Sequence, residues 1–338
     1  MVINAQDGKS LDVFGVGNAL LDILAFVEDD FLKTHQLGRG GMTLMDAHQQ
    51  GTLLQELENS PLKLSCGGSA ANTMMAIAQS GGTGYFAAKV GSDTNGEFYR
   101  QDMTAAGIEF GVKSATEEQG PTGTCLVLTT PDAERTLCTN LGVSIALSQA
   151  DIDWEQLRRS QYVYIEGYLW DAPEPRQACL DILQQAKSHN VKVALTFSDL
   201  FLVERHGDEL RQLSAEYADV IFCNADEVKR FCQETDLEAC ARQMSSLADL
   251  IFITNGGQGC LVVQNKTITP VSGFPVKPID TVGAGDAFAG GVLYGITNGL
   301  TTEEAALWGN YLGSQIVQVR GPRLSESYSS HLEKIIGR

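Results

Sequence analysis

The sequence predicts an α/β protein with a doubly wound, mostly parallel central sheet and a small β-sheet lid. Short apolar runs rich in β-branched residues alternate with amphipathic stretches along most of the chain. This alternation is typical of parallel strands joined by crossover helices. The chain has 338 residues, 43% of them hydrophobic, and no long linker divides it. Because such a chain can bury one large core, we expect residues 1–338 to form a single domain.

The apolar runs and the helical patterns between them give the expected elements of the core. The predicted strands lie at residues 11–17, 85–91, 162–169, 191–197, 219–224 and 250–257. The clearest predicted helices lie at residues 69–80, 175–190 and 225–234. Parallel sheets of this kind bind ligands beyond the carboxyl ends of their strands, so we expect the site there.

Two stretches break the alternation and are predicted to form the lid, at about residues 20–47 and 109–142. The second contains a predicted hairpin around Pro131-Asp132-Ala133-Glu134. A small sheet that projects from the edge of an α/β core can close over a bound ligand.

Composition excludes several classes of function. With 24 basic and 42 acidic residues the formal net charge is −18, so nucleic acid is an unexpected partner. No apolar run approaches the roughly 20 residues that cross a bilayer, so no membrane contact is expected and the cytoplasm is the expected compartment. The eight cysteines and five histidines are scattered singly, which disfavours a Cys/His metal centre.

The most informative segment is PIDTVGAGDAFAGG, at residues 278–291. Gly283, Ala284 and Gly285 are small residues placed before a predicted helix, where uncovered N–H groups and the helix dipole form an anion hole. Asp286 follows them and is placed to accept the proton of an attacking hydroxyl. The alternative is a helix cap after a glycine turn.

A second glycine pair also precedes a predicted helix. Gly67 and Gly68 leave the backbone open, and Asn72 adds an amide one turn later that can hold a ligand hydroxyl. The alternative is a glycine turn with Ser69 as the N-cap. The N-terminal Gly15-Val16-Gly17 lacks the third glycine of a dinucleotide fingerprint, and Walker A is absent.

Five motifs in a fixed order resemble those of ribokinase-like, or PfkB-family, carbohydrate kinases, over about residues 12–322. The motifs are Gly67-Gly68, Gly91-x-Asp93-x-x-Gly96, Asn224-x-x-Glu227, Thr254-x-Gly256-x-x-Gly259 and Asp280-Thr281-x-Gly283-Ala284-Gly285-Asp286. The resemblance implies an α/β core with a β-lid and phosphoryl transfer from ATP with Mg²⁺. It implies that Asp286 is the catalytic base and that Arg135 is a lid arginine over the transferring phosphate.

The resemblance also assigns the nucleotide side of the site. It places Asn224 and Glu227 in the network around Mg²⁺, with the metal contact indirect. Nucleotide contacts are assigned to Asn224, Thr254, Gly256, Gly259 and, near the adenine, Asn310. Members of the family often use a monovalent cation such as K⁺, for which Asp280 and the Val282 carbonyl are the candidates here.

The N-terminal motif Gly17-Asn18-Ala19-Leu20-Leu21-Asp22 is similar to that of adenosine kinases, in which the matching Asp holds the ribose hydroxyls. The carboxylate of Asp22 suits a vicinal diol. The expected substrate-binding residues are Asn18, Asp22, Gly67, Gly68, Asn72, Met42, Tyr168 and Phe201. Met42 stands where eukaryotic adenosine kinases tend to have a Gln that binds adenine, which brings adenosine specificity into question.

The expected function is transfer of the γ-phosphate of ATP to a primary hydroxymethyl group, with the ribose 5′-hydroxyl of adenosine or a related nucleoside as the first candidate. The alternatives are a fructokinase or another sugar kinase and, third, a catalytically inactive ligand sensor of the same fold. The expected partner is a small-molecule acceptor, and the expected assembly is a monomer or a homodimer.

Overall fold

The computed structural model describes residues 9–132, 134–324 and 326–338. Its core is an eight-stranded sheet with the order β13-β12-β11-β10-β9-β8-β1-β5. All neighbours from β5 to β11 are parallel, whereas β12 and β13 are antiparallel. The strands are β1 (Leu11–Val16), β5 (Gly84–Ala87), β8 (Ser160–Glu166), β9 (Lys192–Thr196), β10 (Val220–Asn224), β11 (Leu250–Thr254), β12 (Gly259–Gln264) and β13 (Thr267–Ser272). The predicted mostly parallel α/β fold is confirmed.

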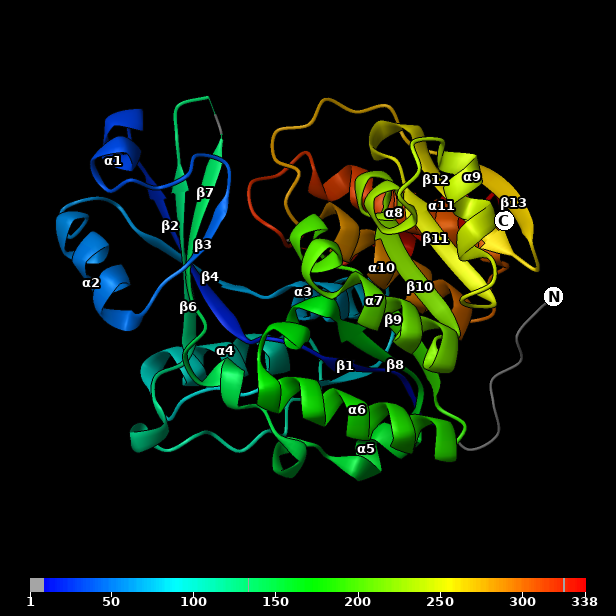
Figure 1. The fold of residues 1–338 in the computed structure, drawn as a ribbon, viewed down its shortest axis with the longest axis horizontal. Helices are drawn as coiled ribbons and strands as arrows, with labels where there is room; N and C mark the ends of the chain where they lie inside the picture. Colours follow the sequence, from blue (N-terminus) through cyan, green and yellow to red (C-terminus); the bar gives the residue numbers. More distant parts are fainter. Residues whose placement is uncertain (1–8, 133, 325) are drawn as a thin grey trace.

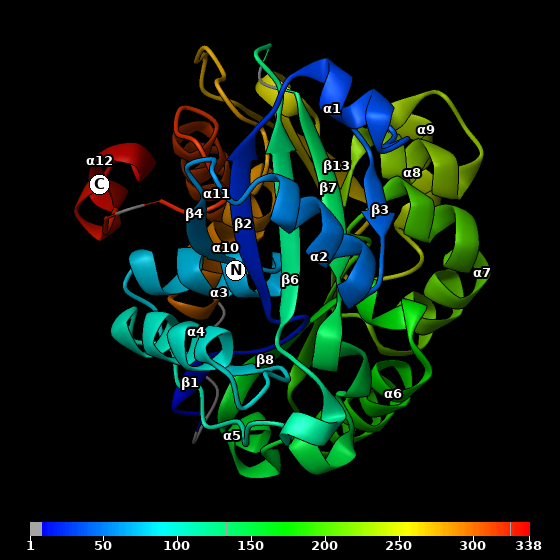
Figure 2. The same cartoon turned by 90° about the vertical axis from the view of Figure 1, so that its left-hand side faces the viewer.

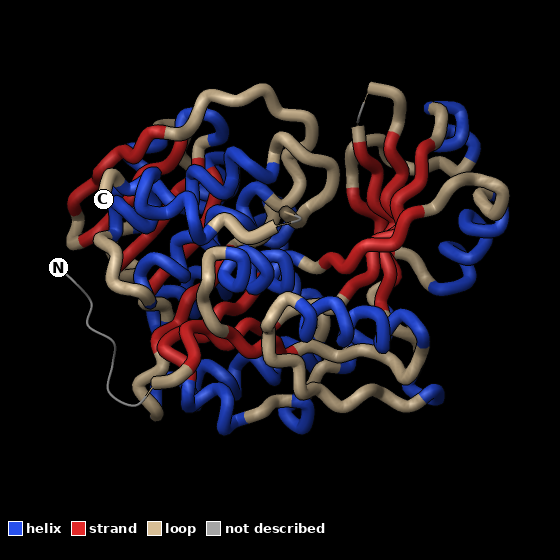
Figure 3. The backbone as a smooth tube through the Cα atoms, turned by 180° about the vertical axis from the view of Figure 1, so that it is seen from behind, coloured by secondary structure: helices blue, strands red, loops and turns tan. Residues whose placement is uncertain are grey.

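Helices cover both faces of this sheet (Figures 1 and 3). Those against one face are α3 (Ser69–Gln79), α4 (Thr94–Ala105), α10 (Ala284–Thr297) and α11 (Thr302–Ile316). Those against the other are α5 (Trp154–Arg159), α6 (Pro173–Ser188), α7 (Leu200–Tyr217), α8 (Ala225–Cys232) and α9 (Leu237–Met244). The C-terminal α12 (Leu332–Ile336) packs near α11. Among the described helices, none is both long and apolar enough to span a membrane.

A second, five-stranded mixed sheet, which we call the lid, stands beside the core (Figures 1 and 2). Its strands, in spatial order, are β3 (Met42–Leu44), β7 (Arg135–Asn140), β6 (Gly123–Thr129), β2 (Leu20–Phe26) and β4 (Lys63–Gly67). Helices α1 (Asp29–Thr34) and α2 (Ala47–Glu56) bury its outer face. The opposite face is turned toward the core.

The structure differs from the sequence-based expectation at several elements. The predicted hairpin is present as the antiparallel pair β6 and β7, although Ala133 lies outside the described residues. Residues 109–122 belong with the core instead of the lid sheet, since Glu109 bridges Tyr85 and Ala115 bridges Gly91. The sequence does not predict β4, β12 and β13. Strands β4 and β13 are partly exposed and lack a continuous apolar run, whereas β12 is mostly buried and contains the short apolar run CLVV.

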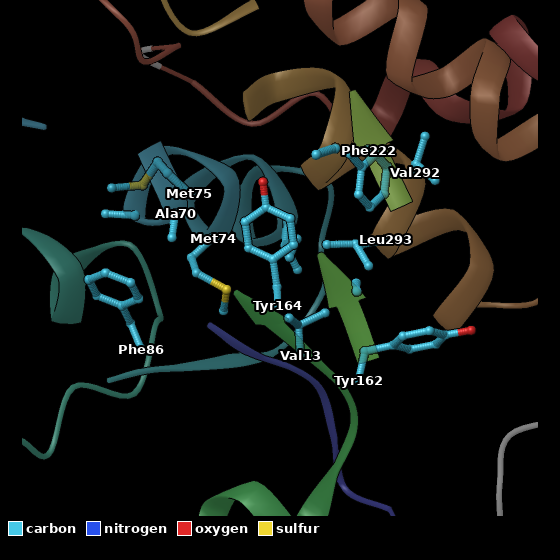
Figure 4. Packing of buried hydrophobic residues seen from close by; sticks show 14 of the residues in the cluster. Val13, Ala70, Met74, Met75, Phe86, Tyr162, Tyr164, Phe222, Val292 and Leu293 are labelled. Carbon is cyan, nitrogen blue, oxygen red and sulfur yellow. The ribbon is translucent and has the colours of Figure 1, made fainter. Parts of the chain in front are cut away.

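Helix α10 lies between α3 and α11, and glycines allow both contacts. A Cβ at Gly290 would come within 2.5 Å of the Ala76 Cβ and 2.6 Å of the Thr73 carbonyl oxygen on α3. A Cβ at Gly291 would meet the Gly309 Cα on α11 at 2.9 Å. Below these contacts, side chains of α3, α10 and the sheet pack together, as the labelled residues of Figure 4 show. This packing fixes the start of α10 against the start of α3.

We predict that Gly290→Ala destabilises the protein by about 1–3 kcal/mol, because the added methyl group meets backbone that cannot move aside cheaply. Chemical denaturation measures the change. Gly51→Ala on α2 is the matched control, since its Cβ would meet nothing within 4 Å; it should raise stability by up to about 1 kcal/mol. Equal effects of the two substitutions would refute the packing argument.

Candidate active site

A cavity of about 390 Å³ lies between the lid and the carboxyl ends of the core strands. The core contributes Asn72 and Asp286 to its wall, and the lid contributes Asp22, Met42 and Arg135. These residues are far apart in the sequence, and the fold brings them together at the position where open α/β sheets bind ligands.

Asp286 lies in the first turn of α10, whose N-cap is Gly283. Its Oδ1 accepts a hydrogen bond from the Ser69 hydroxyl at 2.6 Å, and its Oδ2 accepts one from the Asn72 Nδ2 at 3.1 Å. Both donors belong to the first turn of α3, so the starts of two helices meet across one carboxylate. The alternative interpretation of Ser69 as an N-cap is wrong, because Gly68, with φ of 96°, is the cap residue.

The environment of Asp286 suits a base that works near neutral pH. Burial raises the pKa of Asp286 to about 6, while the hydrogen bonds from Ser69 and Asn72 and the charge of Arg323 act in the opposite direction. The carboxylate is therefore ionised at pH 7 and has an affinity for protons above that of an exposed aspartate.

The backbone beside Asp286 leaves amides open toward the cavity. Among the described residues, the N–H groups of Gly283 and Gly285 have no hydrogen-bond partner, whereas that of Ala284 donates to the Thr281 carbonyl at 3.3 Å. Gly283 and Gly285 line the cavity, and a Cβ at Gly285 would meet nothing within 4 Å. Two of the three predicted amides are thus free to hold an anion. The sequence pattern places Ala284 and Gly285 before the helix, whereas in the structure both lie within α10.

Gly283 is required by its surroundings. Its φ is 81°, and a Cβ there would come within 2.6 Å of the Pro322 carbonyl oxygen. A glycine is therefore the only residue that fits without displacing backbone.

Glu166 is a site residue that the sequence analysis missed. It ends β8, is 1% exposed, and accepts hydrogen bonds from the Asn18 backbone N–H at 2.7 Å, the Asn18 Nδ2 at 3.0 Å and the Ala70 N–H at 2.7 Å. Burial raises the pKa of Glu166 to about 7, against the effect of these hydrogen bonds. Glu166 joins the end of β1 to the start of α3. A single carboxylate inside the apolar run YVYIEGYL was the signal that could have found it.

On the lid side, Asp22 faces the cavity beside an apolar surface. Burial raises the pKa of Asp22 to about 7, and the charges of Arg323 and Arg135 partly offset this. A Cβ at Gly67 would come within 2.5 Å of the Asp22 Oδ1, so Gly67 gives the carboxylate its room. Next to Asp22, the lid wall of the cavity is formed by Met42, Leu44, Val127 and Leu137.

Arg135 reaches from β7 of the lid to the core. Its guanidinium forms an ion pair with Asp280. The same carboxylate accepts hydrogen bonds from the N–H groups of Gly321 at 2.8 Å and Val282 at 3.2 Å. Asp280 is thus already paired with a cation of the protein itself, and this arrangement does not favour the predicted K⁺ site at Asp280 and Val282.

The sequence model of the pfkB family of carbohydrate kinases matches residues 49–327, which is most of the chain. The chain belongs to the PfkB family. It is therefore a phosphotransferase whose acceptor is an alcohol group, and the resemblance inferred from the five motifs is confirmed.

This PfkB kinase is similar to adenosine kinases over most of its length. It is 32% identical to the adenosine kinase of Saccharomyces cerevisiae, over 91% of this chain and 95% of that protein. Its structure matches the adenosine kinase of Sinorhizobium meliloti with a TM-score of 0.89 at 30% identity, covering 96% of this chain and 99% of the other. It matches a probable sugar kinase of Rhizobium etli CFN 42 with a TM-score of 0.90 at 30% identity, covering 96% and 98%.

The nucleotide side of this PfkB kinase contains only part of the predicted set. Asn224 is the N-cap of α8 and forms a capping box with Glu227, and both line the cavity together with Thr254. Burial raises the pKa of Glu227 to about 7. Gly256 and Gly259 are not part of the cavity wall.

Of three other residues predicted to contact the ligand, one lines the cavity and two do not. The Asn310 side chain donates to the carbonyls of Val271 and Ser272, both at 3.1 Å, and does not reach the cavity. Phe201 is 58% exposed near the start of α7 and is also outside the cavity wall. Tyr168 does line the cavity. The two residues outside the wall were assigned by likeness alone, without a local constraint.

We predict that Glu166→Gln lowers the free energy of unfolding by about 1–3 kcal/mol although the two side chains have the same shape. All three partners of Glu166 are N–H donors, so the amide NH₂ of glutamine has to face one of them and leave it unsatisfied. Glu174→Gln, at an exposed position on α6, is the control and should change stability by less than about 0.5 kcal/mol. Denaturant titration of both variants is the measurement, and a neutral result at Glu166 would contradict the assigned network.

Proposed function

We propose that this PfkB kinase transfers the γ-phosphoryl group of ATP to the ribose 5′-hydroxyl of adenosine or a closely related nucleoside. The observation that carries the nucleoside assignment is the wall of the cavity, where Asp22 borders an apolar surface formed by Met42, Leu44 and Leu137. A nucleoside offers a flat base for the apolar surface and a vicinal diol for the carboxylate. A free sugar has no base, so the apolar surface would face sugar hydroxyl groups instead of an apolar ring. The likeness to adenosine kinases supports the same choice.

In the proposed reaction, the acceptor hydroxyl oxygen attacks the γ-phosphorus and forms the new P–O bond. The bond between the γ-phosphorus and the bridging oxygen breaks, and ADP leaves with the electron pair. Asp286 takes the hydroxyl proton, and the N–H groups of Gly283 and Gly285 stabilise charge on the transferring group. A loose transition state needs little prior deprotonation, so a carboxylate with a pKa of about 6 suffices.

Kinases of this family use ATP with Mg²⁺. The described residues contain no group of three His, Cys, Asp or Glu side chains able to hold a metal ion alone. This fits a Mg²⁺ that is carried mainly by phosphate oxygens and water. Glu227 and Asn224 are the residues that would border it, and the ion would neutralise phosphate charge. Both Glu227 carboxylate oxygens accept hydrogen bonds from Asn224, which fits an indirect contact.

Arg135 has a second partner in this proposal. In the structure Arg135 lines the cavity and forms an ion pair with Asp280, which is not part of the cavity wall. When ATP binds, the phosphate competes with Asp280 for the guanidinium, and Arg135 then offsets the charge that develops during transfer.

A sugar kinase is the second candidate, and one observation favours it. Met42 lines the cavity, and its thioether cannot form the strong hydrogen bonds that identify the polar edge of adenine. A relative in the structural comparison is itself described as a probable sugar kinase.

A panel of acceptors distinguishes the two candidates. ADP release is measured with Mg²⁺ and ATP against adenosine, inosine, ribose and fructose. We predict that kcat/KM for adenosine exceeds that for either free sugar by at least about 100-fold, because burial of a base on the apolar wall adds a few kcal/mol of binding free energy. A fructose value equal to or above that of adenosine would overturn the nucleoside assignment.

We also predict that Asp286→Asn folds and binds acceptor but loses about 10²- to 10⁴-fold in kcat. In the wild type, kcat should fall as the pH drops through about 6, since protonation of Asp286 removes the base. Asp226→Asn, an exposed change in the first turn of α8, is the control and should retain full activity. Near-normal turnover of Asp286→Asn would refute the role of Asp286.

A further inference from the structure

We infer that Arg323 is a positioning residue for this kinase: it fixes the side-chain amide of Asn72, which in turn aligns the Asp286 carboxylate with the acceptor hydroxyl. No sequence motif pointed to Arg323, and its side chain does not line the cavity. The inference rests on the proposed role of Asp286 and extends it to a residue one step removed from the substrate.

Arg323 is held at three points. Its Nε donates to the Asn72 Oδ1 at 2.9 Å, one terminal nitrogen forms an ion pair with Asp102 at 2.5 Å, and the other approaches the Gly67 carbonyl at 3.4 Å. The guanidinium side chain is 10% exposed. These contacts join α3, α4 and the end of β4 around one planar, permanently charged group.

The contact with Asn72 decides which end of its amide faces Asp286. Because the Asn72 Oδ1 accepts from Arg323, the Nδ2 is left to donate to Asp286 at 3.1 Å. A flipped amide would place its oxygen against the Asp286 carboxylate and its NH₂ against the guanidinium, and both contacts are repulsive. Arg323 therefore allows a single orientation of Asn72, the one that supplies a donor to the base.

The segment that carries Arg323 is itself fixed at the start of α10 and at the end of α3. The Gly321 N–H donates to Asp280 at 2.8 Å, and the Pro322 carbonyl lies against Gly283. Leu324 is 5% exposed, and its carbonyl accepts from the Gln79 side chain at 2.6 Å. Residues 321–324 thus form a strap from the start of α10 to the end of α3, and the Arg323 side chain reaches from it to Asn72 in the first turn of α3.

The charge of Arg323 acts on the same carboxylate. It lowers the pKa of Asp286 against the effect of burial, and it acts on Asp22 in the same sense. The other polar or titratable groups around Asp286 are Ser69 and Asn72 on α3 and, from β8 and the turn after it, Tyr164, Glu166 and Tyr168. Removal of the guanidinium takes away the positive charge that lowers the pKa of Asp286 and should therefore raise that pKa.

Arg100 provides a matched control. Like Arg323, it is a partly buried arginine that satisfies backbone carbonyls, those of Phe110 at 3.2 Å and Val112 at 2.8 Å. It also packs over the Phe110 ring. Arg100 is not part of the cavity wall, so Arg100→Gln reports the cost of losing a structural arginine alone.

The test compares the pH dependence of kcat in the wild type, Arg323→Gln, Arg323→Lys and Arg100→Gln. We expect Arg323→Gln to lose about 10- to 100-fold in kcat through misalignment and to move the acidic limb of the profile upward by about one pH unit. Arg323→Lys keeps the positive charge but lacks the planar guanidinium with its several N–H donors. The acidic limb of its profile should therefore stay near that of the wild type, while kcat still falls. Arg100→Gln should leave both kcat and the limb unchanged.

A profile of Arg323→Gln with the wild-type limb and kcat, and only a lower Tm, would overturn the inference. A second measurement tests the inference without relying on turnover. It follows the titration of the Asp286 carboxyl carbon by NMR, with the signal assigned by comparison with Asp286→Asn. If the wild type transfers no phosphoryl group, the proposed function fails. An upward shift of this titration in Arg323→Gln would still support the inference, and an unchanged titration would refute it.

Discussion

The site depends on one partly buried carboxylate held between the starts of two helices. Asp286 begins α10, and its two oxygens are bound by Ser69 and Asn72 from the first turn of α3. This contact exists only because α10 and α3 approach closely, and glycine at position 290 permits that approach. Any change in the distance between the helices moves the base relative to the open amides of Gly283 and Gly285.

Electrostatics explains how a strongly acidic protein can bind a polyanion. The cavity wall contains four carboxylates whose pKa values are raised by burial, namely Asp22, Glu166, Glu227 and Asp286. Arg323 of the strap lowers the pKa values of Asp22 and Asp286, and Arg135 of the lid lowers that of Asp22. Backbone amides at the start of α10 add positive potential without a side chain. Phosphate can therefore be held locally although the net charge of the chain is −18.

Sequence reasoning found the parts of the site that are encoded locally. Gly283, Gly285 and Asp286 lie in one short segment, and Asn224 with Glu227 forms a capping box over four residues, so each group can be recognised without the rest of the fold. Asp22 and Met42 are likewise in the cavity wall.

The missed residues act across the fold. Arg323 and Asn72 are 251 positions apart, and Glu166 binds Asn18 across 148 positions, so no local pattern connects them. Asn310 and Phe201 have residue types suited to adenine, but neither lines the cavity: the Asn310 amide donates to two carbonyls of the edge strand β13, and Phe201 lies on the surface. Residue type predicts what a side chain can bind, and tertiary contacts decide whether it is available.

The central claim is that Asp286 receives the proton of the acceptor hydroxyl. A crystal structure with adenosine and a non-hydrolysable ATP analogue tests it most directly. We predict that the 5′-oxygen lies within about 3.2 Å of an Asp286 carboxylate oxygen, with the γ-phosphate against the amides of Gly283 and Gly285. A 5′-oxygen that points away from Asp286, or a phosphate bound elsewhere in the cavity, would contradict it.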